Sequence, residues 1–273
     1  MSALKYSTRF VAGSCLTIAI VFNGAMAQPA PAYEPKVGQR GKDVVWVPTS
    51  QSLVDRMLDM ANVTADDYVI DLGSGDGRTV ITAAKRGAVA HGIEYNPDMV
   101  ALSKKNAEKE GVSDKATFVE GDLFASDFSK ATVVTMFLLP NINMRLRPKL
   151  LDMKPGTRIV SNSFDLGDWT ADETATAKDC NSHCTAYFWI VPAKVEGTWQ
   201  TPQGELKLEQ KFQMVKGTLT KDNVVAPVTE GRLKGSEIAF TAAGTRYTGQ
   251  VDGNTITGRS NANGKEDDWK ATR

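Results

Sequence analysis

The sequence lacks an excess of charge of either sign. Lysine plus arginine and aspartate plus glutamate both number 32. A balanced chain has no general attraction to nucleic acid, so we expect no nucleic-acid partner. The apolar content of 41% and the charged content of 23% are ordinary for a soluble globular protein. With 273 residues, the chain is long enough for one large domain and a small one.

The apolar run near the N-terminus, residues 11–22, is too short for an ordinary membrane span. Basic residues precede this run, and small residues follow it up to Ala27. This pattern predicts a signal peptide over residues 1–27, cleaved between Ala27 and Gln28. We therefore expect a periplasmic or secreted protein with no stable membrane insertion after cleavage. An anchor formed by an uncleaved N-terminal segment is the alternative.

Cysteine is scarce, with three residues in the chain. Cys15 falls within the predicted signal peptide, which leaves Cys180 and Cys184. An even count in an oxidising compartment favours a disulfide, here closing the tight loop Cys180-Asn-Ser-His-Cys184. Free thiols, or a metal site formed by the two cysteines and His183, are the alternatives. Three ligands in so short a stretch make a poor zinc spacing, so we assign no metal.

Strand and helix patterns alternate regularly from Val44 to Val191. Strands are expected over residues 68–72, 88–94, 116–120, 131–138, 156–163 and 185–191. Helices are expected over residues 51–61, 79–86, 97–110 and 143–152. Such alternation predicts an α/β fold with a mostly parallel sheet flanked by helices. Ligands in these folds bind at the carboxyl ends of the strands.

The helical periodicity vanishes after Pro192. Short alternating runs follow, separated by turns rich in glycine, asparagine and aspartate. They predict a small all-β meander, either a sandwich or a barrel. We therefore expect a linker over residues 28–43, a first domain over 44–193 and a small β domain over 194–273. The β domain carries no catalytic constellation, and we interpret it as an appendage that stabilises the protein or binds a partner.

A glycine-rich turn joins the first expected strand to the first expected helix. Residues 68–78 read Tyr-Val-Ile-Asp-Leu-Gly-Ser-Gly-Asp-Gly-Arg. Gly73, Gly75 and Gly77 permit φ > 0 and a close approach of a ligand, and the helix start offers free N–H groups. The spacing differs from the G-x-G-x-x-G of dinucleotide folds. With Asp71 it resembles motif I of the S-adenosylmethionine-dependent methyltransferases that have a seven-stranded Rossmann-like (class I) fold. A tight turn without a ligand is the alternative.

Two further acids end the second and third strands. Glu94 follows the glycine-rich turn at about the 20-residue spacing of an acid that accepts hydrogen bonds from a ribose. A carboxylate that caps the next helix is the alternative reading. The resemblance implies that Asp122 meets the adenine amine and that Leu123 meets the adenine ring. Residues 120–122 are otherwise a polar turn.

The resemblance implies S-adenosyl-L-methionine as the cofactor. Donors in the glycine-rich turn then meet its amino-acid end, while Gly77 permits close packing of helix on strand. The predicted cofactor-binding residues are Thr49, Asp71, Gly73, Ser74, Gly75, Asp76, Glu94, Tyr95, Asp122 and Leu123.

The fourth strand leads to Pro140 and Asn141, which we predict to form the substrate side. Many amino-group methyltransferases carry an acidic or Asn-Pro-Pro motif at this place, and this sequence lacks it. Methyl transfer from a sulfonium needs mainly alignment and a deprotonated nucleophile. A desolvating pocket lowers the pKa of a lysine. We therefore assign no catalytic residue.

Three segments extend the likeness. They are Trp46-Val-Pro-Thr49, the stretch 71–85, and Phe137-Leu-Leu-Pro140 with the residues up to Trp169. Their order resembles the small lysine methyltransferases related to the mitochondrial enzyme that methylates the ATP synthase c-subunit. The likeness covers about residues 44–191 and implies a protein lysine as methyl acceptor, with the segment of Thr49 packed over the cofactor.

The predicted signal peptide and the β domain depart from the mitochondrial members, so their substrates are not carried over. A small-molecule O- or N-methyltransferase is the first alternative. An exported binding protein that kept the cofactor fold without catalysis is the second.

Overall fold

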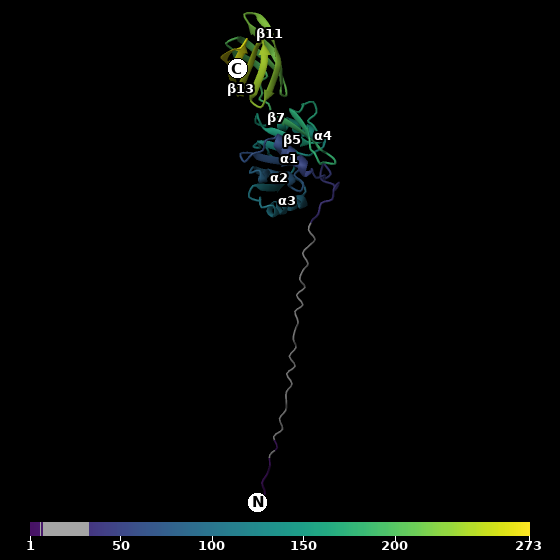
Figure 1. The fold of residues 1–273 in the computed structure, drawn as a ribbon. Coiled ribbons are helices and arrows are strands. Elements are labelled where there is room, and N and C mark those ends of the chain that lie inside the picture. The colour runs from purple at the N-terminus through teal and green to yellow at the C-terminus, as the bar shows by residue number, and fades with distance from the viewer. Residues whose placement is uncertain (6, 8–32) are drawn as a thin grey trace. The chain divides into compact units, whose positions relative to one another are not determined.

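The computed structural model describes residues 1–5, 7 and 33–273 (Figure 1). Residues 33–273 form one compact unit. The apolar run and the cleavage site of the predicted signal peptide lie outside the described residues, so export stays a prediction. Among the described residues, no helix combines the length and the apolar character needed to cross a membrane.

The α/β part of the unit contains every helix and strand that the periodicity predicts. The helices are α1 (Gln51–Met60), α2 (Arg78–Lys85), α3 (Pro97–Lys109) and α4 (Pro140–Leu151). The strands are β1 (Tyr68–Leu72), β2 (Val89–Glu94), β3 (Ala116–Glu120), β4 (Val133–Met136), β5 (Arg158–Asn162), β6 (Glu173–Thr176) and β7 (Thr185–Ile190). Helix α4 begins at Pro140 rather than Asn143, because proline fits the first helical position. Strand β6 was not expected, since it has no buried residue to give an alternating pattern.

The strands form a single seven-stranded sheet in the order β3-β2-β1-β4-β5-β7-β6. All neighbours are parallel except β7, which runs antiparallel to β5 and to β6. The prediction of a Rossmann-like, mostly parallel sheet is thereby confirmed. The chain reverses its direction of winding between β1 and β4, and a crevice for ligands forms at the carboxyl ends of strands on either side of such a point.

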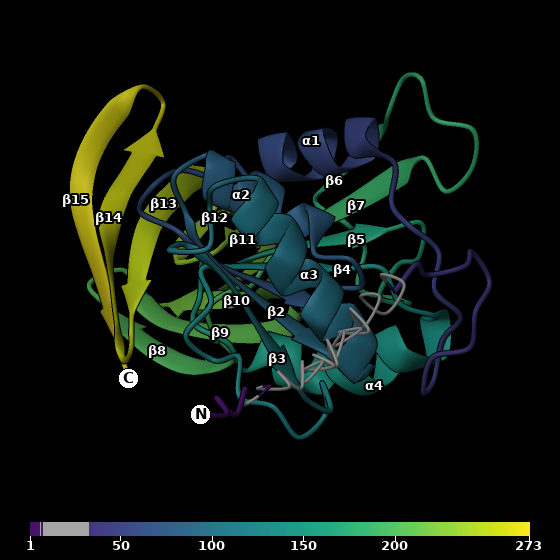
Figure 2. The same ribbon diagram turned by 90° about the horizontal axis from the view of Figure 1, so that it is seen from below.

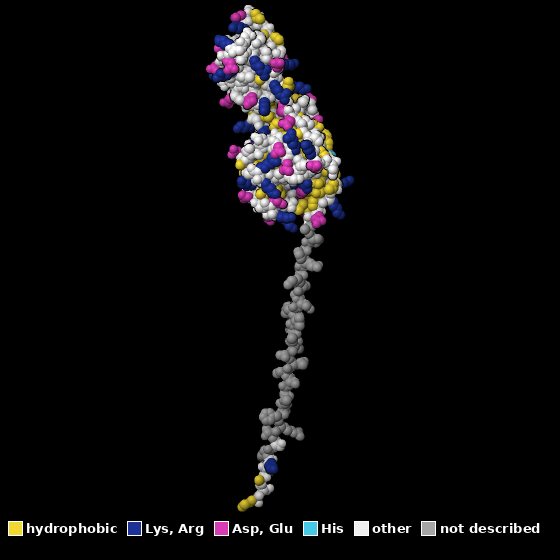
Figure 3. Space-filling view, viewed as in Figure 1, with side chains coloured by type: hydrophobic (Ala, Val, Ile, Leu, Met, Phe, Trp, Pro, Cys, Tyr) yellow, Lys and Arg dark blue, Asp and Glu magenta, His cyan; other side chains and the backbone are white. Residues whose placement is uncertain are grey.

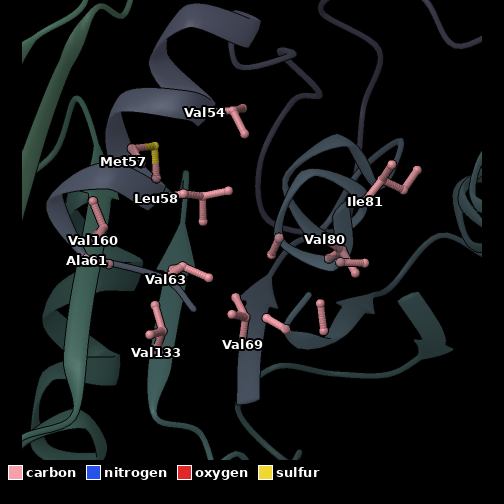
Figure 4. Packing of buried hydrophobic residues seen from close by; sticks show 14 of the residues in the cluster. Val54, Met57, Leu58, Ala61, Val63, Val69, Val80, Ile81, Val133 and Val160 are labelled. Atoms are coloured by element: carbon pink, nitrogen blue, oxygen red, sulfur yellow. The ribbon is translucent and has the colours of Figure 1, made fainter. Parts of the chain in front are cut away.

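Alternate residues of each strand supply two separate cores. Val69 faces the cluster that holds the apolar side chains of α1, α2 and α3, and its neighbour Ile70 faces the cluster that holds those of α4. Figure 2 shows α1, α2 and α3 lying over the sheet. Figure 4 shows Met57 and Leu58 of α1 directed at the strand residues below them. Helix α1 is fixed at its start by Ser50, whose side chain accepts a hydrogen bond from the backbone N–H of Leu53.

The C-terminal part is an all-antiparallel closed barrel, which confirms the β meander and selects a barrel over a sandwich. Its strands are β8 (Gly197–Thr201), β9 (Gly204–Lys211), β10 (Met214–Lys221), β11 (Val224–Lys234), β12 (Glu237–Ala242), β13 (Thr245–Asp252), β14 (Thr255–Ala262) and β15 (Lys265–Thr272). Trp199, Phe240 and Trp269 are buried in its core. The barrel is closed by pairing of β15 with β8, recorded at Thr272 and Gln200.

The turn between β9 and β10 joins the barrel to the loop that precedes β6. The Phe212 ring stacks on Trp169, with ring centroids 5.8 Å apart. The side-chain amide of the buried Gln213 donates a 2.7 Å hydrogen bond to the carbonyl of Thr170. An aromatic contact and a hydrogen bond therefore hold this turn against the loop before β6. On the face that Figure 3 shows, basic and acidic side chains are interspersed over the described surface.

Candidate active site

A cavity of about 250 Å³ opens at the carboxyl ends of β1, β2 and β4. Every residue predicted to bind the cofactor lines it, namely Thr49, Asp71, Gly73, Ser74, Gly75, Asp76, Glu94, Tyr95, Asp122 and Leu123. The sheet brings these residues together because parallel strands end at one edge. Pro140 and Asn141, the predicted substrate side, are exposed and are not among the lining residues. Their neighbours Leu139 and Ile142 line the cavity instead.

The glycine-rich turn follows β1 in a conformation that glycine favours. Gly75 has a φ of 54°, and a Cβ there would lie 2.8 Å from the indole nitrogen of Trp46. Gly77 has a φ of 83°, and a Cβ there would lie 2.8 Å from the Phe118 ring. Both positions therefore exclude a side chain for steric as well as conformational reasons. Gly77 serves helix–strand packing.

The backbone donors of the turn are bonded within the protein. The N–H groups of Gly73 and Ser74 donate to the carbonyl of Ile93, and the N–H of Gly75 donates to Glu94. The donors that were expected to meet the amino-acid end of the cofactor are therefore already used in this structure.

Glu94 holds the turn from the end of β2. One carboxylate oxygen accepts a 2.9 Å hydrogen bond from the N–H of Gly75, and the other accepts a 3.0 Å bond from the N–H of Asn96. The cap of α3 is Asn96 itself, whose side chain accepts from the N–H of Asp98. A carboxylate has about four lone-pair positions, so each Glu94 oxygen keeps one for a further donor.

Asp71 is a buried carboxyl at the end of β1, with 6% of its surface exposed. Burial raises the pKa of Asp71 to about 7, against a 2.7 Å hydrogen bond from the Thr135 hydroxyl that favours ionisation. The charges of Glu94 and Asp76 contribute to this raised pKa. Asp76 is paired with Arg78, so the carboxyls of Asp71 and Glu94 are the ones that favour a ligand with positive charge.

Ser74 is a second unusual polar residue in the turn. Its hydroxyl oxygen is buried and has no hydrogen-bond partner within residues 33–273 as the structure describes them. A Cβ on Gly92 would lie 2.5 Å from this oxygen, so the hydroxyl packs toward β2 and not into the cavity.

The segment of residues 33–49, which we call the strap, contributes one wall of the cavity. Its residues from Gln39 to Thr49 line the cavity without interruption. Lys42 pairs with Asp122 at 2.7 Å and lies 4.6 Å from the centre of the Tyr95 ring. Arg78 donates a 2.7 Å hydrogen bond to the carbonyl of Thr49, which ties the strap to the start of α2. The part up to residue 43 was expected to be a linker, and its role in the cavity was not predicted, whereas the segment of Thr49 was expected to pack over the cofactor.

The opposite end of the cavity is aromatic. Phe137, Phe164 and His183 all line it. His183 lies within the loop that the disulfide between Cys180 and Cys184 closes, with their Cα atoms 5.6 Å apart. The predicted disulfide is therefore confirmed, and the metal-site alternative is excluded because both sulfur atoms are bonded to each other. Beyond the two cysteines that bracket His183, no sequence pattern indicates the aromatic wall.

Known proteins resemble the α/β part closely. The ANTKMT methyltransferase domain family matches residues 71–173. A protein-lysine N-methyltransferase from Saccharolobus islandicus is 46% identical over 54% of this chain and 94% of its own length. The chain belongs to this protein-lysine N-methyltransferase family.

A solved structure and a second relative add to this likeness. A crystal structure described as an RNA methyltransferase from Salinibacter ruber contains S-adenosyl-L-homocysteine. It is 47% identical, with a TM-score of 0.52, and the match covers 55% of this chain and 96% of that one. The Rattus norvegicus lysine N-methyltransferase named for the ATP synthase c-subunit is 36% identical over 47% of this chain, and the match spans 60% of that enzyme's length. The chain is thus an S-adenosylmethionine-dependent methyltransferase.

The cavity of this methyltransferase fits that cofactor. The glycine-rich turn brings its backbone to the cavity wall, with no side chain at Gly73 and Gly75 to keep a ligand away. The spare lone pairs of Glu94 suit a pair of ribose hydroxyls. Asp71, whose carboxyl ionises more readily beside a cation, suits the positively charged sulfur of the cofactor.

Proposed function

We propose that this methyltransferase transfers a methyl group to the side-chain amine of a protein lysine. The observation that carries the proposal is the 46% identity to a protein-lysine N-methyltransferase. The match covers 94% of that enzyme's length. Bound S-adenosylmethionine supplies a methyl group on a positively charged sulfur. The protein's part is to hold the cofactor, to align the amine and to keep water away.

The lining residues divide the cofactor between them in this proposal. Glu94 accepts hydrogen bonds from the ribose hydroxyls, and Asp122 with Leu123 receives the adenine. The amino-acid end lies against the turn between Gly73 and Gly75, whose N–H groups are bonded to Ile93 and Glu94. Asp71 balances the positive charge, because its carboxyl is buried beside the turn and ionises more readily when a cation is near.

The strap completes the enclosure. Trp46 packs against the Gly75 position and Thr49 lies beside it on the cavity wall. Lys42 of the strap pairs with Asp122, and both line the cavity. We propose that the strap shields the cofactor from solvent, which strengthens the electrostatic interactions within the site.

RNA is the second candidate acceptor, because the Salinibacter ruber structure is described as an RNA methyltransferase and is 47% identical. The charge of this chain argues against it, since acidic and basic residues are equal in number. RNA-binding proteins commonly gather basic residues on one surface.

The test is to incubate the purified protein with S-adenosylmethionine carrying a tritiated methyl group and a cell extract. Half of each sample is then digested with protease and half with ribonuclease. We expect macromolecular label that protease releases and ribonuclease does not, and methyllysine after acid hydrolysis. Label that only ribonuclease releases would assign the enzyme to RNA. The Glu94→Gln variant serves as the control for cofactor-dependent labelling.

We further propose that the protein is exported and cleaved after Ala27. The basic and apolar pattern of residues 1–27 supports this, and a disulfide between Cys180 and Cys184 suits an oxidising compartment. N-terminal sequencing of the protein from its native cell should give Gln28. A cytoplasmic protein that begins at Met1 would contradict the proposal.

A further inference from the structure

Three aromatic rings from distant parts of the chain meet at the end of the cavity away from the strap's Lys42. Phe137 follows β4, Phe164 follows β5, and His183 precedes β7. Because β7 runs antiparallel to β5, its start lies at the same sheet edge as the end of β5. The ring centroids are 5.2 Å apart for Phe137 and His183, and 6.3 Å apart for each of the other two pairs. We call these three residues the aromatic triad.

The backbone around the triad is held in conformations that residues other than glycine rarely adopt. Ser163 has a φ of 63° and His183 a φ of 55°. Each such residue costs about 1–3 kcal/mol and persists only when its surroundings fix it. Here the N–H of Ser163 donates a 2.7 Å hydrogen bond to the carbonyl of Thr185, and the disulfide closes the loop on the other side of His183.

A chain of hydrogen bonds fixes the tautomer of His183. The Asn162 amide donates to the Thr49 hydroxyl at 3.1 Å, so its carbonyl oxygen accepts from the Ser163 hydroxyl at 2.8 Å. The single proton of Ser163 is thereby used. Its oxygen, 3.2 Å from Nδ1 of His183, must accept from that nitrogen. In the neutral imidazole the proton is therefore on Nδ1, and Nε2 carries a free lone pair.

We propose that the aromatic triad is the binding site for the side chain of the target lysine. The faces of Phe137 and Phe164 attract its ammonium group and pack on its methylene chain, as aromatic rings do with organic cations. Nε2 of His183 accepts a proton from the ammonium and passes it to solvent, which the exposed ring of His183 contacts. The amine then has the lone pair that methylation requires.

The disulfide acts in this proposal by positioning His183. It constrains the chain from Cys180 to Cys184, so that the histidine keeps its left-handed backbone and its bond to Ser163. The ligand class is a primary alkylamine, which deepens the lysine specificity proposed above and rests on it. No pocket residue outside the triad is needed to explain the choice of an amine.

Amine binding can be measured without knowing the acceptor protein. The untagged chain contains two histidines, so the ring signals of ¹⁵N-histidine-labelled protein can be assigned with a His91→Ala variant. His91 hydrogen bonds to Thr117 and is not among the cavity-lining residues, which makes it an internal control. The probe is n-butylammonium chloride, added in the presence of S-adenosylhomocysteine, with n-butanol as the uncharged match.

We expect a saturable shift of the His183 signals with n-butylammonium, no shift of the His91 signals, and little response to n-butanol. Reduction of the disulfide, or a Cys180→Ser/Cys184→Ser variant, should weaken the apparent affinity for n-butylammonium. Binding of S-adenosylhomocysteine by calorimetry should stay unchanged and shows that each sample is folded. Unmoved His183 signals, or equal shifts with n-butanol, would overturn the amine site.

Catalysis gives a separate readout with poly-L-lysine as the methyl acceptor. Phe164→Ala should raise the KM for poly-L-lysine by about 3- to 30-fold, the range of cation–π attraction. His183→Phe should leave the KM near the wild-type value but lower kcat at least about 100-fold, because it keeps an aromatic ring and removes the proton acceptor. Equal kcat for the wild type and His183→Phe would overturn the proton transfer. Failure of the wild type to methylate any lysine would instead refute the proposed function, while the n-butylammonium titration would still judge the amine site.

Discussion

Replacing Asp71 by asparagine should stabilise the cofactor-free protein at alkaline pH. Asparagine keeps an oxygen that can accept the 2.7 Å hydrogen bond from the Thr135 hydroxyl. It removes a carboxyl that is buried near Glu94 and Asp76, whose charges disfavour its ionisation. The native residue therefore weakens the fold in the pH range where it must ionise.

The size and sign follow from the two pKa values of Asp71. The pKa is about 7 in the folded protein against a reference of 3.8, a gap that corresponds to about 4 kcal/mol in all. Between these two pKa values, the unfolded chain has lost the proton that the folded chain retains. The free energy of unfolding of the wild type therefore falls as the pH rises through this window, and levels off above about 7. About 3 kcal/mol of the effect falls between about pH 5 and pH 8.5.

Urea unfolding of the cofactor-free proteins at several pH values measures the difference. The advantage of Asp71→Asn over the wild type should grow by about 3 kcal/mol from about pH 5 to pH 8.5. Asp67→Asn is the matched control at the other end of β1. Burial raises the pKa of Asp67, yet hydrogen bonds from Thr64, Thr132 and Arg158 outweigh it and keep that pKa below its usual value.

The stability that Asp67 contributes is present above its unfolded pKa and is lost only as the pH falls below that value. The difference between Asp67→Asn and the wild type should hence be constant from about pH 5 to pH 8.5. An advantage of Asp71→Asn that is equally constant over this range would refute the reasoning. Asp71→Asn should also bind S-adenosylmethionine more weakly, because a residue that lowers the stability of the cofactor-free protein is kept for its role in cofactor binding.

Three further predictions concern the turn and the barrel. Gly77→Ala should lower the free energy of unfolding by about 2–5 kcal/mol, from a left-handed backbone and a Cβ 2.8 Å from the Phe118 ring, and urea unfolding measures this loss. Glu94→Gln should weaken cofactor binding about 10- to 100-fold by calorimetry, because its amide group replaces one of two acceptor oxygens; unchanged affinity would exclude the ribose role. Gln213→Ala should cost about 1–3 kcal/mol by leaving the carbonyl of Thr170 without its bond, and thermal unfolding with no loss of stability would show that water replaces the amide.

The cofactor end of the cavity could be predicted because its residues are tied to strand ends. Asp71, Glu94 and Asp122 each follow or end a recognisable apolar run, and parallel strands deliver such residues to one edge. Local sequence thus contains nearly all the information needed to place them.

The acceptor end could not be predicted in this way. His183 reaches the cavity through a loop closed by a covalent bond, and its neighbour Phe164 comes from a different connection. Lys42 belongs to a stretch without periodicity, and only its long-range contact with Asp122 gives it a place. Closure of the barrel is likewise non-local, because it depends on pairing between β8 and β15, the first and last strands of that region. Such contacts are set by tertiary packing and leave no pattern in the neighbouring residues.

The closed barrel limits how it can recognise another chain. Strands β8 and β15 pair at Thr272 and Gln200 alone, whereas the other neighbouring strands pair over most of their length. Along the rest of β15 no pairing with β8 is recorded among the described residues, so an extended peptide has this one side for backbone addition, the mode that open sheets use. Elsewhere each strand has two paired neighbours, and a partner is selected by side chains on the outer surface or the hairpin turns. Such selection depends on the identity of those side chains and can change in evolution while the backbone stays as it is.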